Sequence, residues 1–170
     1  MSEIKIKLGD IERLSQGLRA LVQITNLLPG TAYRVFKLDK AVGAIYEVYM
    51  KKRNEILDKY GIYSVEIPDK GKYTLDKSVT PYVWRNGGDT MEKVPDELMS
   101  KVVWTAKDAS AVEGANAELK SLGDTDESIS EATLKLSQLR TVDKDGHTTD
   151  VGVSPVLMAM LNEIVMDDTN

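Results

Sequence analysis

Residues 11–60 read IERLSQGLRALVQITNLLPGTAYRVFKLDKAVGAIYEVYMKKRNEILDKY, with Pro29-Gly30 near the middle. Apolar residues recur in steps of three and four on both sides of this dipeptide, which places them on one stripe of a helix. Because two such stripes joined by a tight turn should face each other, the pattern predicts a long antiparallel helical hairpin. The first stripe contains Ile11, Leu14, Leu18, Leu21, Thr25 and Leu28, and the second contains Val35, Leu38, Val42, Ile45, Tyr49, Lys52 and Ile56.

The ends of the hairpin are marked by residues that favour helix termini. Asp10 is expected to cap the first helix with its carboxylate, and Thr31 to cap the second. We expect the first helix to end near Leu28 and the second near Tyr60, where Gly61 is the usual left-handed terminator. The second helix is then the longer one, and its overhang needs cover from the downstream half of the chain or from a partner. The side chains on this overhang are Tyr49, Ile56 and Tyr60.

Strand patterns lie on both sides of the hairpin. Residues 3–8 and 62–67 alternate apolar and polar side chains, which predicts strands. Lys70-Gly71 and Asn86-Gly87-Gly88 are typical of turns, so one or two β-hairpins should follow the long helices. Residues 94–107 fit a helix and a strand equally well, and the pattern alone does not decide between them.

Two short helices are expected in the second half. Ser110 and Glu113 have the spacing of a capping box, and Ser154-Pro155 is typical of a helix start. The predicted fold class is therefore α+β, with an N-terminal strand and long helical hairpin followed by short β-hairpins and two short helices. Residues 1–61 would hold the strand and the hairpin. Residues 62–170 would form a mixed part that packs on the hairpin, and the two parts would form one structural unit.

The charge of the chain is unevenly distributed along the sequence. Residues 1–60 contain 11 Lys/Arg and 7 Asp/Glu, a net charge of +4, whereas residues 61–170 contain 11 Lys/Arg and 20 Asp/Glu, a net charge of −9. Such a basic hairpin and acidic remainder could meet head to tail between copies, or both could simply be solvated. The absence of cysteine excludes disulfides and thiol catalysis. Neither a signal peptide nor a membrane-spanning run is expected from the short apolar stretches.

No motif in the sequence indicates catalysis, a cofactor or a metal. The only histidine, His147, lies in a predicted turn and is expected to be solvated. The nearby Asp143, Asp145, Gly146 and Asp150 faintly suggest a calcium loop, but the glycine comes two residues early and Ser154 stands where a glutamate is required. No nucleotide-binding glycine loop is present. We therefore expect a protein that is not an enzyme, with no cofactor and no metal site.

Basic and aromatic residues interleave on the second predicted helix, which is the arrangement that a nucleic-acid backbone needs. The basic residues are Arg34, Lys37, Lys40, Lys51, Lys52 and Arg53, and the aromatic residues are Tyr33, Phe36, Tyr46 and Tyr49. The same helix also carries Asp39, Glu47, Glu55 and Asp58, and the whole chain is acidic. We therefore do not expect nucleic-acid binding.

The order of elements resembles that of a known group of proteins. A short strand leads into a two-helix hairpin, whose second helix ends in the charged run Lys51-Lys52-Arg53-Asn54-Glu55-Ile56-Leu57-Asp58-Lys59-Tyr60-Gly61, and Val153-Ser154-Pro155 opens a terminal helix. This layout resembles small uncharacterised proteins encoded among the structural genes of tailed bacteriophages. The resemblance covers residues 4–61 and, more loosely, residues 110–165. It implies a phage origin and a role in virion assembly or accessory interactions, and it carries over no catalytic residue.

These observations lead to one preferred function and two alternatives. We expect a minor virion or assembly component that acts through contacts with other phage proteins or with copies of itself, as a homo-oligomer, in the virion or the host cytoplasm. The first alternative is an inhibitor of a host defence protein that uses the acidic half as a nucleic-acid mimic. The second is a small enzyme of unknown type. The residues expected at the interface are Tyr46, Tyr49, Lys52, Arg53, Tyr60 and Trp84, because aromatic and arginine side chains dominate interface energies.

Overall fold

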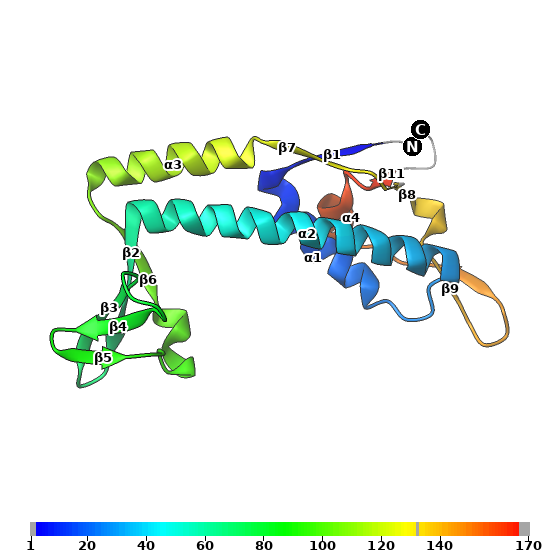
Figure 1. Cartoon of the computed structure of the whole chain (residues 1–170). Coiled ribbons are helices and arrows are strands. Elements are labelled where there is room, and N and C mark those ends of the chain that lie inside the picture. The colour runs from blue at the N-terminus through cyan, green and yellow to red at the C-terminus, as the bar shows by residue number, and fades with distance from the viewer. Residues whose placement is uncertain (1–2, 132, 167–170) are drawn as a thin grey trace. The chain divides into compact units, whose positions relative to one another are not determined.

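The computed structural model describes residues 3–131 and 133–166 and has the α+β composition that the sequence predicts (Figure 1). The chain divides into two compact units. Unit 1 comprises residues 1–52 and 120–170, and unit 2 comprises residues 53–119. The sequence instead suggested a division at Gly61. The observed division falls within the long helix α2 (Pro29–Tyr60), which begins in unit 1 and ends in unit 2.

Unit 1 is organised around the two apolar stripes. The strand β1 (Ile4–Lys7) pairs antiparallel with β7 (Asp126–Ile129), and the predicted alternation is confirmed by the burial of Ile4 and Ile6. The helix α1 (Ile11–Val22) and the first half of α2 contribute their stripes to the same core. The fully buried stripe residues are Ile11, Leu14, Leu18, Leu21, Val35, Leu38 and Val42. The two stripes therefore share one core, and hydrophobic burial accounts for this.

The first helix is shorter than the sequence suggested. It ends at Val22 because the following segment forms backbone hydrogen bonds with the strand β9 (Arg140–Val142). The Leu28 amide donates to the Arg140 carbonyl (3.0 Å), and the Val142 amide donates to the Asn26 carbonyl (2.7 Å). Pro29 opens α2, a position in which the missing amide hydrogen costs nothing. The Pro29-Gly30 pair is thus the start of the second helix, and the link between the two helices lies before it.

Asp10 also differs from the expectation, because its side chain does not cap α1. A 3₁₀ turn (Leu8–Asp10) runs directly into the helix, so the backbone of Asp10 is already helical (φ −94°, ψ −8°). A capping residue needs an extended backbone to aim its carboxylate at the free amides. The Asp10 carboxylate instead lies 3.3 Å from the Arg13 guanidinium.

The C-terminal helix α4 (Pro155–Leu161) begins as predicted, since the Ser154 hydroxyl accepts a hydrogen bond from the Leu157 amide (3.2 Å). It packs closely on α1 at Gly17, where an added Cβ would lie 2.9 Å from Leu161 Cδ2. The strand β11 (Val165–Met166) then pairs in parallel with β8 (Leu134–Lys135). The strand β10 (Thr148–Asp150) ends a few residues before α4 begins.

Unit 2 is built on a five-stranded antiparallel sheet with the strand order β5-β4-β3-β2-β6. The predicted turns at residues 70–71 and 86–88 connect its hairpins, as expected. The uncertain residues 94–107 form a 3₁₀ turn (Asp96–Lys101) followed by an edge strand. The strands are β2 (Gly61–Ile67), β3 (Gly71–Asp76), β4 (Val83–Asn86), β5 (Asp89–Met91) and β6 (Val103–Ala106), and the core contains Val65, Ile67, Tyr73, Trp84, Val94 and Leu98.

The end of α2 within unit 2 is capped by groups from β6 and the residue after it. Trp104 Nε1 donates to the Leu57 carbonyl (2.9 Å), and Lys107 Nζ donates to the Lys59 carbonyl (2.8 Å). Gly61 is not the left-handed terminator that was expected, because it already belongs to strand β2. A glycine fits at this position because an added Cβ would overlap the indole ring of Trp104.

The remaining helix, α3 (Ala109–Gly123), is capped by Asp108 and not by the predicted Ser110. Asp108 Oδ1 accepts hydrogen bonds from the Ala111 amide (2.9 Å) and from the Ser110 hydroxyl (2.7 Å). The Ser110 hydroxyl, together with the amide, lowers the pKa of Asp108, since both donors favour the charged carboxylate. The cap of α3 therefore lies two residues before the predicted Ser110.

Candidate interaction surface

Most of the residues that the sequence suggested for an interface are engaged within the protein. Tyr46 and Tyr49 are partly buried and pack against the core of unit 1. Trp84 is only 8% exposed and belongs to the core of unit 2. These three side chains are not free surface anchors, because each packs in or against a hydrophobic core.

The other three residues differ in their surroundings. The Tyr60 hydroxyl donates to Glu118 Oε1 (2.6 Å), which also accepts a hydrogen bond from Lys59 Nζ (2.5 Å). The Tyr60 ring lies against Gly114, where an added Cβ would be 2.5 Å from Tyr60 Cε1. Arg53 is half-buried, and only Lys52 is well exposed. Tyr60 therefore has a structural role within unit 2.

The solvent face of α2 in unit 1 carries aromatic side chains that the interface prediction missed. Tyr33 is 64% exposed and Phe36 is 57% exposed, and Val48 further along the same face is 54% exposed. Tyr33 and Phe36 are neighbours on the helix surface because they are three residues apart. The buried stripe at Val35, Leu38 and Val42 could have indicated this face, since Tyr33, Phe36 and Lys40 lie on the opposite side of a helix.

Basic side chains accompany this aromatic pair. Lys37 Nζ lies 2.9 Å from Glu131 Oε2 and 5.9 Å from the centroid of the Tyr33 ring. The hydrogen bond to Glu131 raises the pKa of Lys37, because the carboxylate favours the charged ammonium. Within the described residues, Arg34 and Lys40 form no salt bridge. We call Tyr33, Arg34, Phe36, Lys37 and Lys40 the α2 patch.

Two shallow hollows lie on either side of Arg34. One, of about 340 Å³, is lined by Tyr33, Lys37 and Glu131 with the backbone at Gly30. The other, of about 290 Å³, is lined by Leu28, Thr31 and Gln138. Both are open to solvent. The α2 patch has the composition of a contact surface, in which aromatic and arginine side chains are enriched.

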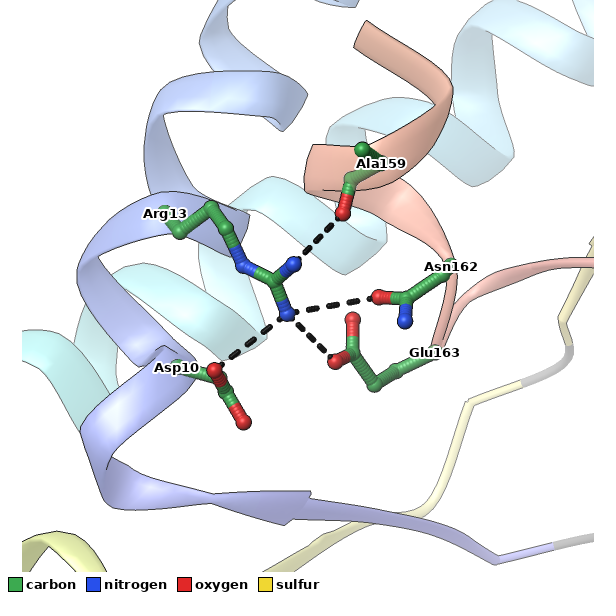
Figure 2. A network of polar contacts seen from close by, with 5 residues as sticks. All are labelled: Asp10, Arg13, Ala159, Asn162 and Glu163. Carbon is green, nitrogen blue, oxygen red and sulfur yellow. Dashed lines mark hydrogen bonds and ion pairs between the residues drawn. The ribbon is translucent and has the colours of Figure 1, made fainter. Parts of the chain in front are cut away.

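Arg13 forms the most connected polar network of unit 1 (Figure 2). Its Nη1 donates to the Ala159 carbonyl (2.7 Å), and its Nη2 donates to Glu163 Oε1 (2.8 Å) and lies 3.3 Å from Asp10 Oδ1 and 3.4 Å from Asn162 Oδ1. A guanidinium at this place binds a carbonyl near the end of α4 and complements the negative end of the helix. The network therefore joins α1 to the end of α4, and every oxygen in it accepts from the same cation.

The turn that holds His147 brings two carboxylates close to the histidine. Asp143 Oδ1 accepts from the amides of Asp145 (2.8 Å) and His147 (2.9 Å), which shapes the turn. His147 Nδ1 lies 3.4 Å from Asp143 Oδ2, and the histidine side chain is 81% exposed. The ligand-type atoms of Asp143, Asp145 and His147 lie within 4.8 Å of one another, but all three residues are exposed. The solvated histidine that the sequence predicted is confirmed.

Comparisons of the chain with protein families, with curated proteins and with solved structures found no match. No helix in the described residues is long and apolar enough to cross a membrane.

Proposed function

We propose that this chain is a non-enzymatic bacteriophage protein that acts through protein–protein contacts, as a minor component of the virion or of its assembly. The observation that supports a contact function is the exposure of Tyr33 and Phe36 side by side on α2. Phe36 is the only phenylalanine of the chain, and more than half of its surface faces water. An exposed aromatic pair of this kind gains free energy when a partner removes it from water.

The surroundings of the pair favour a protein partner. Arg34 is free to form a two-pronged hydrogen bond with a carboxylate, because it makes no salt bridge in the described part of the chain. Aromatic residues next to arginine are the residues that contribute most to protein interfaces. The virion part of the proposal rests on the layout of residues 4–61, in which β1, α1 and α2 follow the order typical of the phage group.

The alternative of an acidic nucleic-acid mimic has less support, because the acidic half of the sequence does not form a separate body. Unit 1 contains 13 Lys/Arg and 15 Asp/Glu, a net charge of −2, and unit 2 contains 9 Lys/Arg and 12 Asp/Glu, a net charge of −3. The basic residues of α2 up to Lys52 and the acidic residues after position 120 share unit 1. A nucleic-acid mimic needs an extended surface of negative charge, and the small net charges of the two units do not favour such a surface.

The experiment is to blot purified particles of the phage that encodes the chain, with the wild type and with a Tyr33→Ser/Phe36→Ser variant. The wild-type chain should be found in particles or in an assembly intermediate. The amount of the variant there should be lower by about tenfold or more, because the loss of two aromatic anchors weakens an interface by at least that factor. The matched control is Val156→Ser, which changes a residue that is 66% exposed on α4, outside the α2 patch. Equal incorporation of the double variant, or absence of the chain from particles and intermediates, would refute the proposal.

A further inference from the structure

The side-chain ammonium of Lys77 lies against two aromatic rings and one carboxylate in unit 2. Its Nζ is 5.0 Å from the centroid of the Tyr63 ring and 5.5 Å from the centroid of the Tyr82 ring. The same nitrogen donates a hydrogen bond to Asp58 Oδ1. Aromatic faces attract cations at this range, so the three side chains surround one positive charge. We call Asp58, Tyr63 and Tyr82 the ammonium cage.

Three separate parts of unit 2 supply the cage. Asp58 lies in the last turn of α2, Tyr63 lies on β2, and Tyr82 comes directly before β4. Tyr63 is held in place because it packs against the core of unit 2. Lys77 follows directly after β3, and its side chain is 31% exposed, the lowest value for any cation that forms a salt bridge in the described residues. This partial shelter from water strengthens the attraction between a cation and the rings.

The distances from Lys77 Nζ to the two rings match those of a nitrogen that carries methyl groups. A methyl carbon is about 1.45 Å from its nitrogen and makes contact with a ring carbon at about 3.5–4.0 Å. A nitrogen whose methyl group points at a ring is therefore about 5.0–5.5 Å from that ring. The space between Nζ and each ring is thus wide enough for one methyl group, while Asp58 accepts one N–H.

A hollow of about 160 Å³ lies beside the cage and gives a small cation room to enter. Its lining includes Asp58, Tyr63 and Lys77, the apolar side chain of Leu75, and a second lysine, Lys107. Lys107 Nζ donates to a backbone carbonyl at the end of α2 (2.8 Å). A ligand cation that replaces the Lys77 ammonium meets the same charges as that ammonium, so Lys107 adds no new repulsion.

We propose that the ammonium cage is a binding site for a dimethylated alkylammonium ion, and that Lys77 occupies this site when no ligand is bound. Two methyl groups of the ligand contact the rings of Tyr63 and Tyr82, and its one N–H donates to Asp58. Lys77 competes with a free ligand because a tethered group has a high effective concentration at the cage. A free amine and the methylated lysine of another protein share this chemistry. The site is separate from the α2 patch, and the inference does not depend on the function proposed above.

The test uses the full-length chain with Lys77→Ala, which empties the cage, and N,N-dimethylbutylammonium as the probe. An NMR titration follows the ring protons of Tyr63 and Tyr82. We expect millimolar binding to the variant, as for a ligand of few heavy atoms, and binding to the wild type that is weaker by about tenfold or more. Butylammonium, which lacks the methyl groups, should bind the variant about threefold or more weakly than the probe. The neutral N,N-dimethylbutanamide should bind about tenfold more weakly, because it has no charge for the rings and the carboxylate to attract.

Two further variants separate the cage from a general loss of a lysine. Tyr82→Leu, added to Lys77→Ala, removes one ring from a position that is 53% exposed, and the affinity for the probe should fall about two- to fivefold. The matched control is Lys93→Ala in the same unit, which breaks an exposed ion pair with Asp96 and leaves the cage closed, so it should bind the probe no better than the wild type. If Lys77→Ala lowers the melting temperature, the probe should raise it again and the neutral amide should not.

A last arm distinguishes the two sources of the ligand. A short glycine peptide that contains one dimethyl-lysine is titrated beside the free amine, and binding of both supports a protein ligand, whereas binding of the amine alone supports a small-molecule ligand. No binding of the probe to Lys77→Ala would overturn the proposal and leave Lys77 with a purely structural ion pair. Equal binding of the probe and the neutral amide, or an affinity that Tyr82→Leu leaves unchanged, would also overturn it.

Discussion

Replacing Gly61 by alanine should destabilise unit 2, because the space for a side chain is filled by Trp104. An ideal Cβ at this position would overlap Cε2, Nε1 and Cζ2 of the indole. Trp104 lies directly opposite Tyr63 on β2, and its Nε1 donates to the Leu57 carbonyl at the end of α2. The ring therefore cannot move aside without losing this hydrogen bond.

The expected cost combines two effects. Forcing one extra carbon into a packed site costs about 1–3 kcal/mol, and losing the indole hydrogen bond costs about 1 kcal/mol more. The free energy of unfolding of unit 2 should therefore fall by about 2–4 kcal/mol. With a urea dependence of about 1 kcal/mol per molar, typical of a small unit, the unfolding midpoint should shift down by about 2 M or more.

Tryptophan fluorescence is a specific assay for this change, because the two tryptophans of the chain, Trp84 and Trp104, both belong to unit 2. The matched control is Gly88→Ala in the same unit, where an added Cβ would meet nothing within 4 Å, and its free energy of unfolding should stay within about 0.5 kcal/mol of the wild type. A Gly61→Ala/Trp104→Leu double variant should be less destabilised than the sum of its parts, since the smaller side chain makes room. A wild-type midpoint for Gly61→Ala would refute the close packing of this strand pair.

Three further predictions concern other parts of the chain. Leu18→Asp should unfold unit 1, because it places an unpaired charge among fully buried side chains. The control Leu18→Met should lower the free energy of unfolding by less than about 1.5 kcal/mol. Thermal melts followed by circular dichroism compare the two variants, and equal melting temperatures would contradict the burial of Leu18 in the core. Ser154→Ala should destabilise α4 by about 1 kcal/mol through loss of its capping hydroxyl, measured by urea unfolding, with no change expected for Ser154→Asp. Asp76 should titrate at about 2 in a carboxyl NMR experiment, since the Ser78 hydroxyl and Arg85 lower its pKa from 3.8. The contribution of Asp76 to stability is then complete above pH 3.8 and is lost as the pH falls toward 2. Ser78→Ala should raise the pKa of Asp76. A pKa near 3.8 for Asp76 in the wild-type protein would contradict its hydrogen bonds with Ser78 and Arg85.

Local signals predicted many of the elements correctly. The helical stripes around Leu18 and Val42, the hairpin turns at residues 70–71 and 86–88 and the start of α4 at Ser154 are all where the sequence placed them. Each depends on residues close together in the chain, because periodicity, turn preferences and caps act over a few residues. The predicted capping roles of Asp10 and Ser110 were wrong, since neighbouring turns changed the backbone on which a cap depends.

The candidate surface was harder to predict, because exposure depends on what the rest of the chain covers. The sequence favoured Tyr46, Tyr49 and Trp84, and the structure packs all three against cores. Tyr33 and Phe36 carry the same aromatic signal and remain in solvent. For the residues on α2 the difference follows from the angular position of each around the helix and from the distant segments that pack on one side of it, whereas Trp84 lies on β4 in the core of unit 2.

The amino-acid sequence by itself determined which residues alternate, which turn and which end a helix, and so the α+β class. Only the tertiary structure decided that α1 stops at Val22, that Gly61 makes room for an indole, and that basic and acidic residues far apart in the chain share one unit. The physical reason is that backbone pairing and side-chain packing join segments separated by more than a hundred residues, as in the bond from Leu28 to Arg140. A pattern confined to a few neighbouring residues does not contain that information.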